Sequence, residues 1–300
     1  MTHLKEAGAR VTLNNILYLT DFSEPSEAAL PFAAAVAREF QAKVYAYNVM
    51  IPAAYVYTAP ELIPTGIEAQ EETAQQNMKH VAAQLSGVAH DEIVDRDVAI
   101  WPAVERAIKD YNIDLVVLGT HGRTGAEKLL LGSVAEEVFR RSTAPVLTIG
   151  PFARRGMHAG AKFHRVLYAT DFSEESLAAA PYAISMAQEN QARLILLHVM
   201  KPSGAPRSER EEQDIVSNAI FELHEIMPPN AELWCTAEAV VHAGNPAEKI
   251  LETAKEKGAD LIVLGLRDRG KHLGAATHLE RATAHRVVAH AECPVLTVRA

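Results

Sequence analysis

The segment ILYLTDFSE (16–24) occurs again 150 residues later as VLYATDFSE (166–174), with seven of the nine positions identical. Two further pairs of segments repeat in the same order: DLVVLG (114–119) with DLIVLG (260–265), and PVLTI (145–149) with PVLTV (294–298). The offsets of these pairs are 146 and 149 residues. Three matches at a nearly constant, domain-sized offset indicate a tandem duplication.

The chain has 300 residues, of which 48% are hydrophobic and 22% are charged, as in ordinary globular proteins. This length corresponds to two domains of about 150 residues each. A segment rich in glycine and basic residues, without hydrophobic periodicity, separates the two copies near 150–163. We therefore expect one domain at residues 1–152 and a second at 163–300.

Within each half, short apolar runs alternate with amphipathic segments. In the first half we expect strands at 15–20, 43–50, 93–99, 114–119 and 145–149, and helices at 25–40, 68–86, 102–111 and 133–142. The apolar runs are continuous, which is typical of parallel strands that are buried on both faces. Strand–helix alternation implies right-handed crossovers. The sequence therefore predicts two tandem α/β domains with open, doubly wound (Rossmann-like) sheets, whose ligands bind beyond the carboxyl ends of the strands.

The net charge of −9 argues against sequence-independent binding to nucleic acid or to an anionic membrane, since both favour a basic surface. A small anionic ligand is still compatible with this charge, because local backbone amides can bind it. No apolar run reaches the 18 residues of a membrane span. With only two cysteines, Cys235 and Cys293, and no signal-peptide pattern at the start, we expect a cytoplasmic protein.

The segment GTHGRTGAEKLLLGS (119–133) lies between an expected strand and an expected helix. Its spacing, G-x2-G-x9-G-S, matches neither the P-loop nor the dinucleotide pattern G-x-G-x-x-G. Glycines allow the backbone to approach a ligand closely, and the amides at the start of a helix attract anions. We expect this loop to bind phosphate. In the alternative interpretation, Gly122 and Gly125 only shape the loop and Ser133 only caps the helix.

These segments together, LYLTDFSE (17–24), NVM (48–50), the glycine run and APVLTI (144–149), resemble the nucleotide-binding branch of the universal stress protein family. The resemblance covers both halves. It implies that the glycine run binds the phosphates and ribose of ATP, while a strand-1 aspartate and a strand-2 valine border the adenine. By position, the implied adenine-nucleotide site consists of Leu19, Thr20, Asp21, Val49, Leu118, Gly119, His121, Gly122, Arg123, Gly132, Ser133 and Val134. With this resemblance, we expect five parallel strands per half in the order 3-2-1-4-5, with helices on both faces.

Several of these residues have a second interpretation. Asp21 contacts the nucleotide, holds Mg²⁺ through water, or braces the turn into the first helix. Because Asp171 is present in the second copy, where the glycine pattern is absent, the bracing role is favoured. His121 either binds phosphate or acts as a base, or it is a solvated loop histidine, and Arg123 is alternatively a surface charge. Trp101 stands in Ile-Trp-Pro where the family has Gly-x-Pro, and we interpret it as a core residue.

The second half lacks the glycine pattern. Asp268 stands where Gly122 does, and Arg281-Ala282 stand where Gly132-Ser133 do. A carboxylate about 5 Å from a phosphate charge costs about 3 kcal/mol at an effective dielectric constant near 20. We therefore expect one nucleotide per chain, in the first half, and a degenerate site in the second. Four histidines lie in or near this loop at spacings that do not favour a metal site, namely His272, His278, His285 and His290.

No Walker lysine, carboxylate pair for two metals or water-positioning glutamine is evident, so we assign no catalytic residue. We expect an ATP-binding stress-response protein that acts through nucleotide-dependent conformation and contact with protein partners. The alternatives are a slow, Mg-dependent ATPase and a nucleotide-independent dimerisation scaffold, and ATP versus other adenine nucleotides is left open. The last strand of each half is an apolar edge, so we expect pseudo-two-fold pairing of the halves and consider a homodimer. The Tyr/Pro-rich segment 51–66 is a lid, a docking surface or a linker.

Overall fold

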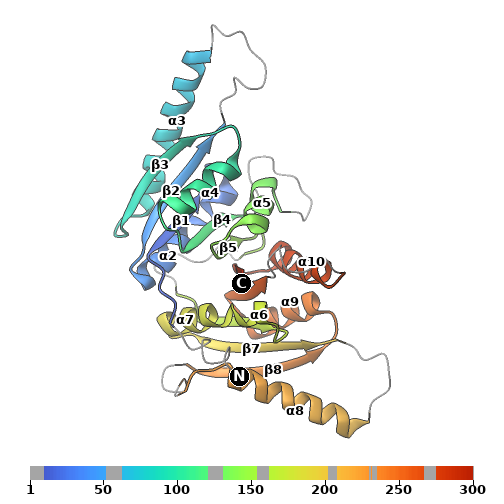
Figure 1. Ribbon diagram of the computed structural model, residues 1–300. Helices are drawn as coiled ribbons and strands as arrows, with labels where there is room; N and C mark the ends of the chain where they lie inside the picture. Colours follow the sequence, from blue (N-terminus) through green and yellow to red (C-terminus); the bar gives the residue numbers. More distant parts are fainter. Residues whose placement is uncertain are drawn as a thin grey trace. The chain divides into compact units, whose positions relative to one another are not determined.

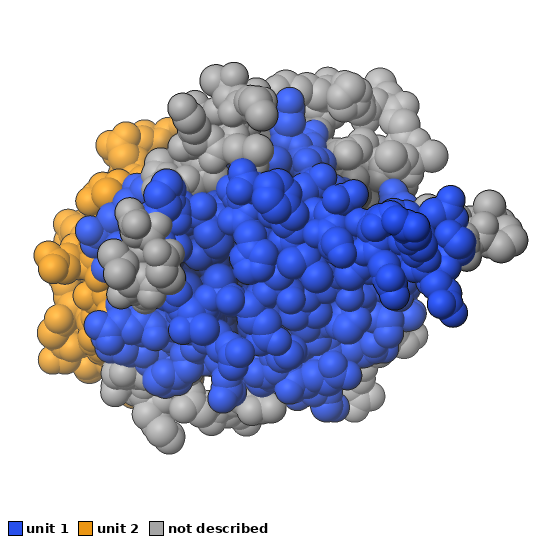
Figure 2. Space-filling model, turned by 90° about the horizontal axis from the view of Figure 1, so that it is seen from below, with its two compact units in different colours: residues 1–11, 152–154, 162–300 blue, residues 12–151, 155–161 orange. Residues whose placement is uncertain are grey.

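The computed structural model describes residues 10–51, 63–120, 131–153, 162–201, 208–229, 231, 235–266 and 275–299, with the backbone alone at 63–67 and 275–282 (Figure 1). The chain divides into two compact units, which Figure 2 colours separately. The N-terminal unit contains residues 12–151 and 155–161, and the C-terminal unit contains residues 1–11, 152–154 and 162–300. Each unit is described below by itself.

The N-terminal unit is built on five parallel strands in the order β3-β2-β1-β4-β5. The strands are β1 (Asn15–Leu19), β2 (Lys43–Met50), β3 (His90–Arg96), β4 (Leu115–Gly119) and β5 (Val146–Ile149). All five residues of the central strand β4 are buried, which requires cover on both faces of the sheet. The predicted fold class and strand order are confirmed in this half.

The C-terminal unit repeats this architecture. Its parallel strands are β6 (Arg165–Thr170), β7 (Arg193–Met200), β8 (Ala237–Ala243), β9 (Leu261–Leu266) and β10 (Val295–Arg299). They pair in the order β8-β7-β6-β9-β10, which is the order of the first half counted along the chain. Strand topology is therefore common to the two copies, and any difference in function must arise from what lies around the sheets.

Helices connect the strands in both units. Those of the N-terminal unit are α1 (Glu24–Glu27), α2 (Leu30–Phe40), α3 (Ile63–Gln84), α4 (Ile100–Asp110) and α5 (Ser133–Arg141). Those of the C-terminal unit are α6 (Glu174–Leu177), α7 (Ala180–Asn190), α8 (Glu209–Glu225), α9 (Pro246–Lys257) and α10 (Ala275–His290). Among the described residues, none of these helices combines the length and the apolar character that a bilayer crossing requires.

The prediction of one helix over 25–40 is wrong, because α1 and α2 are separate helices. Pro31 has no N–H with which to bond the Glu27 carbonyl, and its ring clashes with the preceding turn of a continuous helix. The Ala29 N–H instead donates to the Ser26 carbonyl over 3.0 Å. Pro181 separates α6 from α7 at the same place in the second copy.

Two other boundaries also differ from the prediction. Strand β3 lies at 90–96 rather than 93–99. It is an edge strand of this unit, and its half-exposed polar residues do not form the continuous apolar run from which the other strands were predicted. Helix α3 begins at Ile63 rather than at 68, so the end of the Tyr/Pro-rich segment 51–66 is helical. Residues 52–62 of that segment lie outside the described residues.

A cluster of buried hydrogen bonds joins α1 to the end of β1, and α1 in turn packs on the end of β4. The Tyr18 hydroxyl donates to the Ser26 carbonyl over 2.9 Å, and the Thr20 and Ser26 hydroxyls lie 3.1 Å apart. Burial raises the pKa of Tyr18, so its hydroxyl remains a donor. A Cβ atom on Gly119 would lie 2.3 Å from the Pro25 carbonyl oxygen, so only glycine fits there. Gly119 is therefore required by backbone packing, whether or not it also approaches a ligand.

The second copy contains the same arrangement. The Tyr168 hydroxyl donates to the Ser176 carbonyl over 2.7 Å, and the Thr170 and Ser176 hydroxyls lie 2.9 Å apart. A Cβ atom on Gly265 would lie 2.2 Å from the Glu175 carbonyl oxygen. The repeated segment LYxTDFSE therefore encodes a structural turn in both units.

We predict that Gly119→Ala lowers the free energy of unfolding by about 3 kcal/mol, because the added methyl group overlaps main-chain atoms that cannot rotate away. Gly87→Ala is the matched control: Gly87 has φ +81° and open space around its Cβ position, so only a conformational cost of about 1 kcal/mol is expected. Urea unfolding followed by circular dichroism measures both. Equal losses in the two variants would contradict the packing argument.

Candidate functional site

A pocket opens at the carboxyl ends of β1, β2 and β4 in the N-terminal unit. Its lining residues are Leu19, Thr20, Asp21, Ser26, Tyr47, Asn48, Val49, Ile100, Leu118, Gly119, Thr120, Gly132, Ser133, Val134 and Ala135. Its cavity volume is about 250 Å³, close to the lower end of the range of small-molecule sites. Nine of the twelve residues named from the sequence line it, and the other three, His121, Gly122 and Arg123, lie outside the described residues.

The first turn of α5 forms one wall of this pocket. Gly132 is the N-cap residue, with φ −60° and ψ 154°, and no side chain of the described residues caps this end of the helix. The Gly132 N–H donates to the Thr120 carbonyl over 2.7 Å and so ties the helix start to the end of β4. Any residue can adopt this backbone conformation, so the distinctive effect of glycine here is the missing side chain. The positive end of the helix is thereby open to an anion in the pocket.

Asp21 acts as a brace for the turn between β1 and α1. Its Oδ1 accepts hydrogen bonds from the Ser23 N–H over 3.1 Å and from the Ser23 hydroxyl over 2.5 Å. Asp171 Oδ1 accepts the same two bonds, from the Ser173 N–H over 3.1 Å and from the Ser173 hydroxyl over 2.6 Å. The structural interpretation of Asp21 is confirmed. Since Asp21 also lines the pocket, its contact with a ligand stays a prediction.

Asn48 is a pocket residue that sequence reasoning did not select. Its buried Nδ2 donates to the Thr20 carbonyl over 2.8 Å and holds the ends of β1 and β2 together. In the C-terminal unit His198 Nδ1 lies 2.9 Å from the Thr170 carbonyl oxygen at the same place. An amide within the otherwise apolar end of KVYAYNVM (43–50) was the signal that could have identified it.

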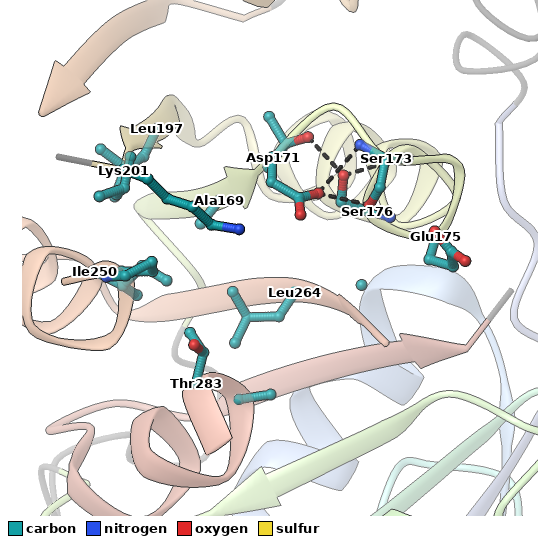
Figure 3. A pocket seen from close by; sticks show the side chains of 15 residues that line it. Ala169, Asp171, Ser173, Glu175, Ser176, Leu197, Lys201, Ile250, Leu264 and Thr283 are labelled. Carbon is teal, nitrogen blue, oxygen red and sulfur yellow. Dashed lines mark hydrogen bonds between the residues drawn. The ribbon is translucent and has the colours of Figure 1, made fainter. Parts of the chain in front are cut away.

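A second pocket occupies the corresponding place in the C-terminal unit (Figure 3). It is lined by Ala169, Thr170, Asp171, Ser173, Glu175, Ser176, Leu197, Val199, Lys201, Pro246, Ile250, Leu264, Gly265, Thr283 and Ala284. Its cavity volume, about 130 Å³, is about half the 250 Å³ of the first pocket, so the two pockets differ in size.

The helices that border the two pockets, α5 and α10, begin at different distances along the chain from the strand that follows each of them. Ala282 corresponds to Ser133 in distance from the Pro-Val-Leu-Thr segment, but α10 already begins at Ala275, seven residues earlier. The backbone amides at 281–284 therefore lie inside a helix, where they bond to carbonyls one turn back. The C-terminal pocket thus lacks the open helix start of the first one. Asp268, from which repulsion of phosphate was expected, lies outside the described residues.

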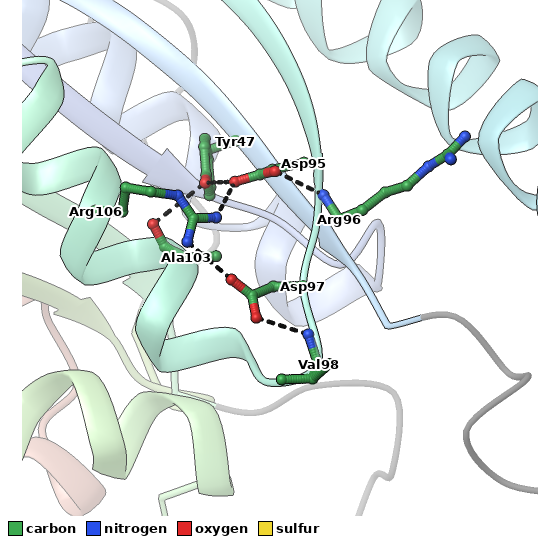
Figure 4. Close-up of polar contacts among 7 residues, drawn as sticks. All are labelled: Tyr47, Asp95, Arg96, Asp97, Val98, Ala103 and Arg106. Carbon is green, nitrogen blue, oxygen red and sulfur yellow. Dashed lines mark hydrogen bonds and ion pairs between the residues drawn. The ribbon is translucent and has the colours of Figure 1, made fainter.

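A polar network lies beside the first pocket, and Tyr47 is its member that lines the pocket (Figure 4). The Tyr47 hydroxyl donates to Asp95 Oδ2 over 2.5 Å, and Arg106 donates to Asp95 over 2.8 Å and to Asp97 over 2.9 Å. Burial raises the pKa of Tyr47, so it stays protonated. Burial alone would raise the pKa of Asp95, but the bonds from Tyr47 and Arg106 outweigh it and lower that pKa. The network joins β2, the end of β3 and α4.

Helix α4 places Ile100 in the pocket and Trp101 in the core. Trp101 is 4% exposed, and the Arg141 guanidinium lies 5.0 Å from its ring centroid. The interpretation of Trp101 as a core residue is confirmed, and Ile100 is the residue of that segment that borders the pocket. Sequence reasoning likewise did not select Ser26, Tyr47, Thr120 and Ala135 as pocket residues.

No group of three or more His, Cys, Asp or Glu side chains gathers among the described residues in a way that could hold a metal ion. The side chains of His272 and His278 are outside that set. Cys235 and Cys293 are both buried, and they do not form a disulfide bond.

Comparison with known proteins extends these observations. The model of the universal stress protein family matches residues 12–150 and again residues 162–299. The chain is similar to a universal stress protein of Methanocaldococcus jannaschii, with 36% identity over 138 residues, or 45% of this chain and 80% of the relative. It is also similar to one of Mycolicibacterium smegmatis, with 27% identity over 299 residues, or 95% and 96% of the two chains.

A solved structure shares the whole architecture. The crystal structure of a universal stress protein from Archaeoglobus fulgidus has a TM-score of 0.66 and 22% identity, and the match covers 96% of this chain and 97% of that one. At this identity the likeness concerns the fold. Together with the two family-model matches, it leads to one conclusion: the chain belongs to the universal stress protein family and carries two copies of its domain in tandem.

Proposed function

We propose that the protein binds one ATP molecule, in the pocket of the N-terminal unit, and acts in stress response through the conformation that this ligand favours. The observation that carries the proposal is the uncapped start of α5 in that pocket, where Gly132 leaves the first-turn amides accessible. A helix start of this kind favours a phosphate group. The C-terminal pocket has no such helix start, because α10 runs past it.

The residues present fit an adenine nucleotide. The apolar side chains of Leu19, Val49 and Ile100 would contact the base, and the α5 amides near Ser133 and Val134 would bind phosphate oxygens. Asp21 would accept a hydrogen bond from the ribose or hold Mg²⁺ through water, while its other contacts brace the turn. His121, Gly122 and Arg123 would complete the phosphate end.

The proposed mode of action is a population shift. A ligand favours the conformation to which it binds more tightly, by an amount equal to its differential affinity. In this unit, the ligand would contact α5, the α1 turn and the ends of β1 and β2 at the same time. The protein partner, pairing between the halves and homodimer formation remain predictions, and slow ATP hydrolysis remains an alternative.

We predict a binding stoichiometry near one ATP per chain in isothermal titration calorimetry of the full chain in the presence of Mg²⁺. One site is expected because, within the described part of the chain, the open start of α5 lies in the N-terminal pocket whereas α10 runs past the C-terminal one. Two equivalent sites would contradict the role given to the start of α10. Absence of any heat, with no rise in melting temperature on adding ATP, would contradict the proposed function itself.

We predict that Gly132→Asp weakens ATP binding about a hundredfold or more, because a carboxylate near the phosphate site costs about 3 kcal/mol. Asp is a favourable N-cap residue at the φ and ψ of Gly132, so the ligand-free protein should be no less stable than the original. Gly132→Asn is the matched control, since it adds the same volume and cap without the charge. If Asp and Asn weaken binding equally, the electrostatic argument fails.

A further inference from the structure

We propose that the outer edge of β8 (Ala237–Ala243) pairs antiparallel with the same strand of a second copy of this chain. The protein then forms a two-fold symmetric homodimer through its C-terminal units. This contact goes beyond the proposed function and does not depend on it, because no residue of β8 lines either of the two pockets described above.

The outer edge of β8 carries backbone groups that are open to a partner strand. Among the described residues, β8 pairs with β7 alone (Figure 1). The Leu194 N–H donates to the Thr236 carbonyl, and the Gly244 N–H donates to the Met200 carbonyl, each over 3.0 Å. Since backbone groups alternate in direction along a strand, the even-numbered residues of β8 face β7. The N–H and C=O groups of its odd-numbered residues point away from β7, and no described residue bonds to them.

The side chains of this edge are mostly apolar. Strand β8 reads AEAVVHA, and all of its residues are half-buried or exposed, whereas the interior strand β7 is buried from Leu194 to Leu197. Its one acidic residue, Glu238, forms ion pairs with Lys257 over 2.5 Å and with Arg193 over 3.0 Å. Unpaired charges, prolines and bulges normally protect an edge strand. Strand β8 contains no proline and pairs with β7 without interruption, so the edge lacks this protection.

The sequence of β8 is complementary to itself. Two copies can run antiparallel with Val240 of one opposite Val240 of the other. This register also places opposite one another Ala237 and Ala243, Glu238 and His242, and Ala239 and Val241. Apolar residues thus face apolar residues, and each Glu238 carboxylate faces an imidazole that can donate a hydrogen bond to it. The open backbone groups of Ala239 meet those of Val241, which satisfies both. A second copy therefore fits this edge in both its side chains and its backbone.

The corresponding strand of the first copy, β3, does not offer such an edge. It reads HDEIVDR, in which four of the seven residues are charged, namely Asp91, Glu92, Asp95 and Arg96. Asp91 pairs with Lys43, and the two side chains are 50% and 36% exposed. Pairing β3 with another strand would remove such groups from water, which costs free energy even where they are ion-paired. We therefore place the dimer contact at β8 and not at β3.

A proline at the open edge tests the contact. Sedimentation equilibrium of the full chain without nucleotide should show a reversible monomer–dimer equilibrium. Ala239→Pro should weaken the dimer about tenfold or more, because each copy loses an N–H that donates across the interface while its bonds to β7 remain. Glu92→Pro is the matched control, since Glu92 of β3 stands where Ala239 stands in β8, and it should leave the dimer unchanged. Circular dichroism checks that both variants are folded.

Cysteine cross-linking tests the register. In the proposed dimer the two Val240 residues form a non-hydrogen-bonded pair, with Cα atoms about 4.5 Å apart, which a disulfide can span. The two Val241 residues are diagonal neighbours about 7–8 Å apart, which is beyond that span. Oxidation with copper–phenanthroline should therefore cross-link Val240→Cys at least tenfold faster than Val241→Cys. Both positions are half-buried, and the unmodified chain, whose Cys235 and Cys293 are buried, gives the background.

Three results would overturn the proposal: a chain that stays monomeric at submillimolar concentration, equal dissociation constants of the Ala239→Pro and Glu92→Pro variants, or equal cross-linking of Val240→Cys and Val241→Cys. None of these measurements involves ATP. A β8 dimer that binds no ATP would refute only the proposed function, and a monomer that binds ATP would refute only this contact.

Discussion

Each unit depends on one buried contact, in which the backbone of a short helix lies directly on a glycine near the end of an interior strand, Gly119 of β4 or Gly265 of β9. In the N-terminal unit, Gly119 has no Cβ to separate β4 from Pro25, and the hydroxyls of Tyr18, Thr20 and Ser26 hold the helix in that position. The carboxyl ends of β1 and β4, the α1 turn and the start of α5 then meet at one edge of the sheet. The pocket exists because these backbone segments approach so closely, and the side chains that line it follow from that geometry.

Much of the fold could be predicted because duplication and periodicity are properties of the chain alone. Continuous apolar runs such as 114–119 identified the central strands, and the tandem repeat identified the two halves. The failures have local physical causes. Pro31 interrupts a helical pattern that continues on either side of it, and β3, at the edge of its sheet, carries polar residues where a central strand would not.

The candidate site was likewise predicted only in part. Residues at the end of a strand or the start of a helix, such as Leu19, Val49 and Ser133, could be selected from position and from the family resemblance, and they do line the pocket. Tyr47 and Ile100 could not, because their role depends on which neighbouring element faces them. The glycine pattern was also only partly informative: packing accounts for Gly119, whereas Gly132 has an ordinary backbone conformation and marks the open start of α5.

The brace formed by Asp21 and Ser23 has a consequence for how such duplicated proteins diversify. Since Asp171 and Ser173 reproduce it, the pair stabilises the same turn in both copies, whatever each pocket binds. The start of the last helix can therefore differ between the copies while the turn beneath it stays the same. An evolutionary survey of tandem relatives should accordingly classify each copy by the residue that opens its last helix, and should give little weight to the strand-1 aspartate.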